Sequence, residues 1–237
     1  YQMSFSLRKR KGKIILNLSA ISNHDIHRAI HNIELVFRAG LGMGRFVALN
    51  VPVEDKSTGE EDRVAIGTVC SVTINGIFLS EGIHSTSRFG GLLELVKGHP
   101  FRFTDIINYD GSSIDPLEIF VKGGMTSVSQ AVLTGNGKIG ASFREFPSVA
   151  LPKVERIKKR LEIMGLGGIL MIGKPGRPLL EIPVSEGRVG MIVAGGLNPL
   201  AAVEESGIAT ENVAMKALFE FEDLMPFWEL NSGVRNL

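Results

Sequence analysis

Apolar and polar residues along this chain follow two different periods, and each period predicts a type of element. Between residues 22 and 39 the apolar residues recur at three- and four-residue spacing, as on one face of a helix. That face consists of Ile26, Ile30, Ile33 and Phe37. Gly40 and Gly42 follow it, and glycine commonly ends a helix. We therefore predict a helix over residues 22–39, with Ser22 or Asn23 as its cap.

Shorter apolar runs, bounded by glycine or charged residues, predict strands and further helices. Strands are expected at residues 13–20, 45–51, 64–69, 138–143, 169–172 and 189–194. Further β-like segments are expected at residues 91–96, 101–107, 117–121 and 214–221. Helices are expected at residues 73–81, 152–164 and 198–206. Thr73 and Asn198 are expected to cap the two short helices, and the acidic stretch 54–62 is predicted to be a polar loop.

The order of these elements repeats, and so do short stretches of sequence. At an offset of 125 residues, Gly12-Lys13-Ile14 matches Gly137-Lys138-Ile139, and Gly40-Leu41-Gly42 matches Gly165-Leu166-Gly167. At the same offset, identical residues also match at Glu61, Arg63, Val64, Gly82 and Ile83. Two copies are too few for a solenoid, which needs at least three repeats. We therefore expect one α/β (α+β) domain over residues 1–237. It would contain two similar strand-helix-strand-strand-helix lobes, 12–136 and 137–237, with additional β segments.

The composition is that of a folded protein from a reducing compartment. Of the 237 residues, 44% are hydrophobic and 22% are charged, and the one cysteine, Cys70, excludes an internal disulfide. No apolar run is long enough to cross a membrane, and the N-terminal residues lack the apolar core of a signal peptide. We therefore expect a cytoplasmic protein. A net charge of +1 argues against a DNA-binding surface, and we interpret the basic stretch 8–13 as a solvated lead-in, with a nucleic-acid arm as the alternative.

Both copies place a tight turn between a strand and a helix. The turns are Val69-Cys70-Ser71-Val72-Thr73 and Ala194-Gly195-Gly196-Leu197-Asn198. Free backbone N–H groups and the positive end of the helix dipole make such turns receptive to anions. A cleft between two lobes is also a common place for a small ligand. We therefore expect an anionic ligand at these turns.

Candidate catalytic and metal-binding residues have simpler interpretations. Cys70 lacks a nearby histidine in a recognisable signature, so we expect a small buried side chain in a pocket wall rather than a nucleophile. The three histidines on the predicted helix 22–39 form a stripe that is usually solvated. The glycine turns at 40–44 and 165–168 follow a helix, the reverse of the order in a dinucleotide-binding fingerprint. We expect no catalytic residues, no metal and no cofactor.

A polar segment after the first short helix supplies donors for a carboxylate. Residues 85–88 contain three hydroxyl groups and Arg88, which offer a bidentate fork and several hydrogen bonds, with an exposed loop as the simpler alternative. Arg63 and Arg188 recur in both copies, so we expect them to form structural ion pairs or caps. Arg88 aligns with Val213 and belongs to one copy only, as a contact to an asymmetric ligand would. We therefore favour Arg88 as the charged contact.

Several longer stretches resemble one protein family. They are GTVCSVT at residues 67–73, SRFGGLLE at 87–94, DPLEIF at 115–120 and GGLNP at 195–199. Together they resemble the regulatory domain of the archaeal nitrogen-regulation repressors of the NrpR family, over about residues 12–227. The resemblance implies a sensor of 2-oxoglutarate, which relieves repression of nitrogen-assimilation genes. It also implies that DNA is bound through a winged helix-turn-helix, which is absent from this chain.

Within the matching motifs, the chemistry of the residues themselves selects the candidate contacts. The ligand-binding candidates are Cys70, Ser71, Thr73, Ser87, Arg88, Gly196 and Asn198. We expect a homodimer or higher homo-oligomer, because repressors commonly read two half-sites, and no membrane partner. Two alternatives stay open, namely an enzyme acting on an anionic metabolite and a purely structural dimerisation domain. The lack of a coherent acid, base, nucleophile or metal set counts against the enzyme.

Overall fold

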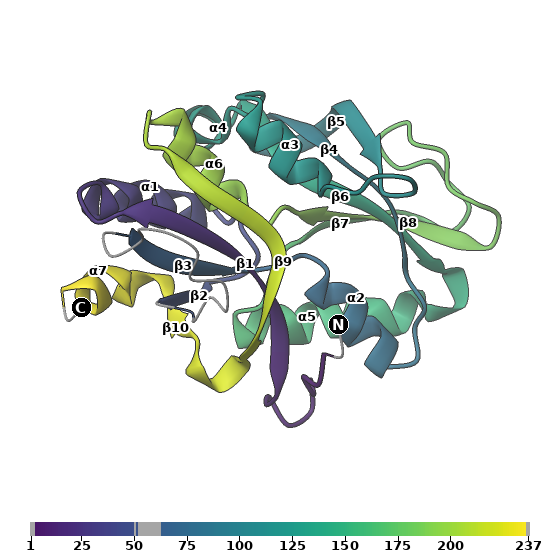
Figure 1. Cartoon of the computed structure of the whole chain (residues 1–237). Coiled ribbons are helices and arrows are strands. Elements are labelled where there is room, and N and C mark those ends of the chain that lie inside the picture. Colours follow the sequence, from purple (N-terminus) through teal and green to yellow (C-terminus); the bar gives the residue numbers. More distant parts are fainter. Residues whose placement is uncertain (1–2, 50, 52–62, 236–237) are drawn as a thin grey trace.

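The computed structural model describes residues 3–49, 51 and 63–235, and these form two five-stranded antiparallel sheets (Figure 1). The first sheet has the order β10 (Met225–Pro226), β2 (Phe46–Leu49), β3 (Arg63–Val69), β1 (Lys13–Ser22), β9 (Thr210–Glu220). The second has the order β5 (His99–Asn108), β4 (Thr86–Val96), β6 (Gly137–Pro147), β8 (Arg188–Ala194), β7 (Ile169–Ile172). The predicted loop 54–62 lies outside the described residues.

Helices connect and cover the strands in the same order in each copy. The helices are α1 (Ile26–Arg38), α2 (Thr73–Ser80), α3 (Pro116–Lys122), α4 (Val128–Thr134), α5 (Leu151–Met164), α6 (Asn198–Glu205) and α7 (Leu230–Val234). The first copy runs β1-α1-β2-β3-α2-β4, and the second runs β6-α5-β7-β8-α6-β9. The predicted fold class, a mixed α/β domain with a repeated element order, is confirmed.

The last strand of each copy leaves its own sheet and joins the sheet of the other. β4 of the first copy pairs with β6 of the second, from Thr86 opposite Glu145 to Leu95 opposite Gly137. β9 of the second copy pairs with β1 of the first, and Figure 1 shows it crossing the molecule alongside β1. Each sheet therefore contains strands from both sequence copies, and neither copy can complete a sheet alone.

Apolar packing ties the two sheets into one body. One core cluster contains Leu16 of β1, Met191 of β8, Phe78 of α2 and Ile157 of α5, all buried. Phe78 also lies edge-on to Phe146 of β6, with 6.2 Å between the ring centroids. A second cluster joins α1 and α6 on the first sheet. Because α2 and α6 pack with the other copy's first helix, the exchange includes these short helices as well as the last strands.

Two glycine-rich turns lie against each other where the copies meet. Arg45 N–H donates to the carbonyl oxygen of Gly165 at 2.9 Å. Gly44 has φ +83°, and a Cβ at this position would overlap the backbone of residues 165–167. These turns therefore form a packing contact between the two copies. That contact accounts for the glycines, so a phosphate-binding role is not needed to explain them.

The structure corrects three predictions of secondary structure, namely the start of one helix, the type of one element and the absence of another helix. α1 begins at Ile26 rather than residue 22, and no side-chain cap bond precedes it, because Ser22 still belongs to β1. Residues 117–121 were expected to be a strand but lie in α3. The cause is the N-terminal signal before them, since the Asp115 side chain accepts the Leu117 N–H at 2.8 Å and Pro116 begins the helix. The helix α4 was not predicted.

The contact between the glycine turns predicts unequal effects of two glycine substitutions. Gly40→Ala should cost about 1 kcal/mol of unfolding free energy, because φ is +71° but no other atom lies within 4 Å of the added Cβ. Gly44→Ala should cost about 2 kcal/mol more, since the added carbon meets backbone that cannot move away. Urea denaturation measures both, and equal costs would contradict the packing described here.

Candidate functional site

The two predicted anion-receptive turns meet at the junction of the copies. Each turn is tied to the first strand of its own copy, since Cys70 N–H donates to Ile15 at 2.9 Å and Gly195 N–H to Gly140 at 2.8 Å. A Cβ on Gly196 would overlap the carbonyl oxygen of Val69, at the end of β3. The second turn therefore packs against the first, and only glycine permits that approach.

Thr73 and Asn198 hold these turns to the neighbouring strands. The Thr73 hydroxyl accepts from Ile15 N–H at 3.3 Å and donates to the Ile15 carbonyl at 3.2 Å. Asn198 makes the equivalent pair of bonds to Gly140 at 2.8 and 2.9 Å, and a third to the Leu41 carbonyl at 2.8 Å. Both residues were expected to cap helices, and that was wrong, because α2 and α6 have no side-chain cap bond.

A buried arginine that was not among the candidates lies beside the first turn. Arg144, on β6, is 1% exposed. Its Nη1 donates to the Ser71 carbonyl at 2.9 Å and to Asn75 Oδ1 at 2.6 Å. Its Nη2 donates to Ser71 Oγ at 2.8 Å, and its Nε to Ser142 Oγ at 3.2 Å. All of these acceptors are neutral, so the guanidinium is solvated by the turn rather than paired with an acid.

Asn75 extends this network to the second predicted segment. Its side-chain oxygen accepts from Ser85 Oγ at 3.0 Å as well as from Arg144, and its amide nitrogen donates to Ser87 Oγ at 2.9 Å. Two of the candidates, Ser71 and Ser87, are therefore brought into one hydrogen-bonded network through Asn75 and Arg144.

Three further ionisable groups lie near this network. Burial raises the pKa of the Cys70 thiol to about 11. Burial also raises the pKa of Tyr109, which hydrogen-bonds to Ser142, and the pKa of Asp115. For Arg144, burial lowers the pKa, while the nearby charges of Tyr109, Cys70 and Asp115 oppose that effect. Burial therefore disfavours the charged form of each of these groups, including the Arg144 guanidinium.

Arg88 is directed to an acidic partner rather than to the first turn. Its Nη1 lies 2.8 Å from Glu145 Oε1 and donates to the Pro183 carbonyl at 2.6 Å. Burial would raise the pKa of Glu145, but hydrogen bonds from Ser185 and Arg88 outweigh it and hold this pKa below its usual value. Arg188 also lies 3.5 Å from Glu145, and Arg63 lies 2.5 Å from Glu211. The expected ion pairs of Arg63 and Arg188 are thus confirmed.

A pocket of about 300 Å³ reaches Asn75 from the surface. Its lining includes Val72 at the start of α2, Ser85, and Met215 on β9. Met215 has φ +52°, and its N–H donates to Asn17 Oδ1 at 3.2 Å, beside an irregularity in the β1–β9 register. The lining of this pocket also includes Asn75, whose amide oxygen accepts the shortest hydrogen bond of Arg144.

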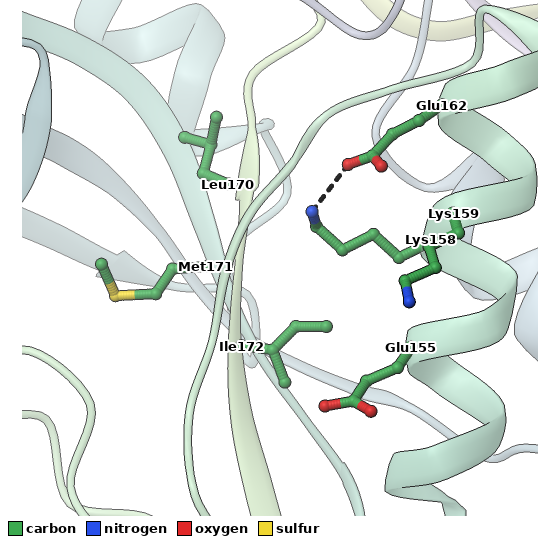
Figure 2. Close-up of a pocket in the computed structure, with 7 residues that line it drawn as sticks. All are labelled: Glu155, Lys158, Lys159, Glu162, Leu170, Met171 and Ile172. Carbon is green, nitrogen blue, oxygen red and sulfur yellow. Dashed lines mark hydrogen bonds and ion pairs between the residues drawn. The ribbon is translucent and has the colours of Figure 1, made fainter.

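A larger groove, of about 530 Å³, lies between α5 and the edge strand β7 (Figure 2). The α5 residues that line it are Glu155, Lys158, Lys159 and Glu162. Lys158 and Glu162 form an ion pair at 2.6 Å. In the first copy the corresponding position beside α1 is filled by the chain itself, since β10 pairs with β2 and Phe227 stacks on Phe37 at 5.3 Å.

The described residues also bear on metal binding and on membrane spanning. Within residues 3–49, 51 and 63–235, no three or more His, Cys, Asp or Glu side chains are grouped so as to hold a metal ion. No helix among the same residues is long and apolar enough to span a bilayer.

Comparison with known proteins identifies the family. Residues 1–226 match the family model described as NrpR regulatory domains NRD1 and 2. The chain belongs to the NrpR regulatory-domain family. It is 32% identical over 224 residues to the global nitrogen regulator NrpRI of Methanosarcina mazei, covering 94% of this chain and 69% of that protein. It is also 32% identical over 230 residues to the global nitrogen regulator NrpR of Methanocaldococcus jannaschii, covering 97% of this chain and 38% of that protein.

A solved structure of the same fold supports this assignment. The crystal structure of a nitrogen repressor-like protein from Methanococcus jannaschii matches with a TM-score of 0.79 and 31% identity, over 94% of this chain and 92% of that one. These relatives are named as global nitrogen regulators, and the chain belongs to the same regulatory-domain family. The chain spans about two thirds of the Methanosarcina mazei relative and well under half of the Methanocaldococcus jannaschii relative.

Arg144 and Asn75 were missed, although the sequence contained a signal for the arginine. At the offset of 125 residues Arg144 aligns with Ser19, so its charge belongs to one copy only. It also directly follows the predicted strand 138–143. The criterion that favoured Arg88 therefore applied equally to Arg144, and nothing comparable marked Asn75.

The raised pKa of Cys70 predicts an unreactive thiol. At pH 7.5 the thiolate fraction of a group with a pKa of about 11 is more than 100-fold below that of free cysteine. Iodoacetamide should therefore modify the folded protein at least ~100-fold more slowly than free cysteine. The urea-unfolded protein, as the control, should react at the ordinary rate. Rapid modification of the folded protein would contradict the burial of this thiol.

Proposed function

We propose that this NrpR domain is the effector-sensing part of a transcriptional repressor of nitrogen-assimilation genes. The proposed effector is 2-oxoglutarate, bound between the two copies next to the first turn. Binding would relieve DNA binding by a winged helix-turn-helix attached to the domain. The observation that carries this proposal is the hydrogen-bonded network of Ser71, Asn75, Ser87 and Arg144 beside that turn.

The chemistry of this network suits the proposed effector. 2-Oxoglutarate is a dianion with a keto oxygen, and it needs hydrogen-bond donors and positive charge in a water-poor site. Ser71 and Ser87 supply hydroxyl groups, and α2 directs its N-terminus toward the turn. Cys70 is the proposed neutral wall, because its thiol holds its proton.

The other candidates have supporting positions in the proposed site. Thr73 and Asn198 would fix the two turns, and Gly196 would let the second turn form the opposite wall. For the charged contact, the repeat pattern favours Arg88, whereas the hydrogen-bond network favours Arg144.

Assembly and DNA binding belong to the proposed whole protein. A homodimer or higher homo-oligomer would let two winged helices read two half-sites of an operator. Binding of the effector would then change the relative position of these half-site readers. A purely structural dimerisation domain is the competing proposal, and it would bind no metabolite.

Calorimetric titration of the chain with 2-oxoglutarate tests the proposed function. We expect saturable binding at one site per chain, without consumption of the ligand. Glutamate, glutamine and succinate should bind at least about tenfold more weakly, because each lacks the keto oxygen and the two amino acids add an ammonium group beside a buried arginine. No binding of 2-oxoglutarate, or equal binding of all four compounds, would refute the proposed sensor.

A further inference from the structure

We infer that Arg144 is the residue that receives a carboxylate of the effector, an inference that rests on the proposed function. Arg144 is fully buried, and an arginine side chain stays protonated in proteins. A buried charge is costly unless it is paired and hydrogen-bonded. A ligand carboxylate in contact with Arg144 would therefore offset part of that cost.

The hydrogen-bond inventory of Arg144 supports this inference. A guanidinium has five N–H groups, and the four bonds of Arg144 to Ser71, Asn75 and Ser142 leave one Nη2 N–H without an acceptor among the described residues. No ion pair formed within the described residues includes Arg144. A carboxylate matches the planar fork of a guanidinium and would supply both the acceptor and the missing charge.

The neighbouring acids are held away from this role. Asp115 uses its carboxylate to cap α3 through the Leu117 N–H, at 2.8 Å. Glu145, the next residue on β6, is already paired with Arg88 and Arg188. Asp115 therefore acts on Arg144 without forming an ion pair with it, and Glu145 pairs with other arginines, so neither carboxylate occupies the place proposed for the ligand.

The pocket lined by Asn75 offers a route to Arg144. The Asn75 side chain lines the pocket and also accepts the shortest hydrogen bond of the guanidinium, at 2.6 Å. Rotation of the Asn75 amide would exchange a neutral acceptor for a ligand carboxylate on Nη1. Asn75 therefore controls access to the proposed site, and Arg144 is the residue that binds the carboxylate.

The inference also fixes the number of ligands. The second turn carries Gly195 and Gly196 where the first carries Cys70 and Ser71, and Ser19 stands where the second copy has Arg144. Hydroxyl donor and cation thus occur together at one of the two pseudo-equivalent sites. The domain should bind one effector molecule.

Calorimetry of Arg144 and Arg88 variants decides between the two candidate contacts, and Arg102→Met, which loses an exposed ion pair with Glu94, is the control for the loss of one positive charge. Arg144→Met keeps much of the side-chain length but removes the charge, and should weaken 2-oxoglutarate binding on the order of 100-fold. Arg144→Lys should recover part of the affinity, because a point charge cannot reproduce the fork. Arg88→Met should change the affinity less than about threefold, since Arg88 serves Glu145.

A second variant does not require removal of the buried arginine. Asn75→Asp is nearly isosteric and places a carboxylate where Arg144 Nη1 already has its closest acceptor. If Arg144 lacks a counter-charge, this variant should raise the melting temperature of the ligand-free domain. It should also abolish the further rise that 2-oxoglutarate gives the parent. A lower melting temperature for Asn75→Asp would overturn the inference even if Arg144→Met does not fold.

The outcomes separate this inference from the proposed function. If the parent binds 2-oxoglutarate and Arg144→Met binds it equally well, the role inferred for Arg144 is wrong, but the proposed sensor function is not. If the parent binds glutarate or succinate through Arg144 but does not bind 2-oxoglutarate, Arg144 does receive a carboxylate, but the proposed effector is wrong. If the parent binds none of these carboxylates, both are wrong.

Discussion

The exchange of strands β4 and β9 between the two copies is the constraint on which the remaining structure depends. Each sheet is completed by a strand from the other copy, so the strands that precede the two turns are brought to a common junction. At that junction Gly196 and Gly44 allow backbone to approach backbone. A small ligand between the copies would therefore contact elements of both halves of the sequence, which is what coupling between lobes requires.

The scaffold is nearly symmetric, but its chemistry is not. Thr73 and Asn198 make equivalent bonds to Ile15 and Gly140, as expected of residues that serve the fold. Arg144 has Ser19 as its counterpart, and its charge therefore has no equivalent in the first copy. Similarly, the carboxylate that pairs with Arg63 lies on β9, whereas the one that pairs with Arg188 lies on β6. The two copies therefore share their backbone arrangement, whereas the proposed ligand site depends on a few positions that differ between them.

Much of the fold could be predicted from periodicity and from the internal repeat. The strand at residues 169–172 matched the structure, and the copy at 198–206 supported the helix at 73–81. Pairing partners could not be predicted, because an apolar alternation shows that a strand has a buried face but not which neighbour supplies its hydrogen bonds. For residues 117–121 the apolar run was compatible with strand or helix, and the Asp115-Pro116 start signal decided it.

The site was only partly predictable for a related reason. Ser71 and Ser87, both predicted contacts, belong to one hydrogen-bond network, but the residues that join them come from β6 and from within α2. From the sequence alone, Arg88 and Arg144 were equally good candidates for the charged contact. Only the pairing of β4 with β6 shows that Arg88 lies beside Glu145. Side-chain partners across an exchanged strand depend on tertiary pairing, which local sequence does not encode.

A crystal structure of the domain with 2-oxoglutarate tests the account most directly. The account predicts one ligand per chain, located between the first turn and β6, with a carboxylate within hydrogen-bond distance of the Arg144 guanidinium and the Arg88–Glu145 ion pair intact. A ligand that displaces Glu145 from Arg88, that lies in the groove between α5 and β7, or that occupies both turns would contradict it.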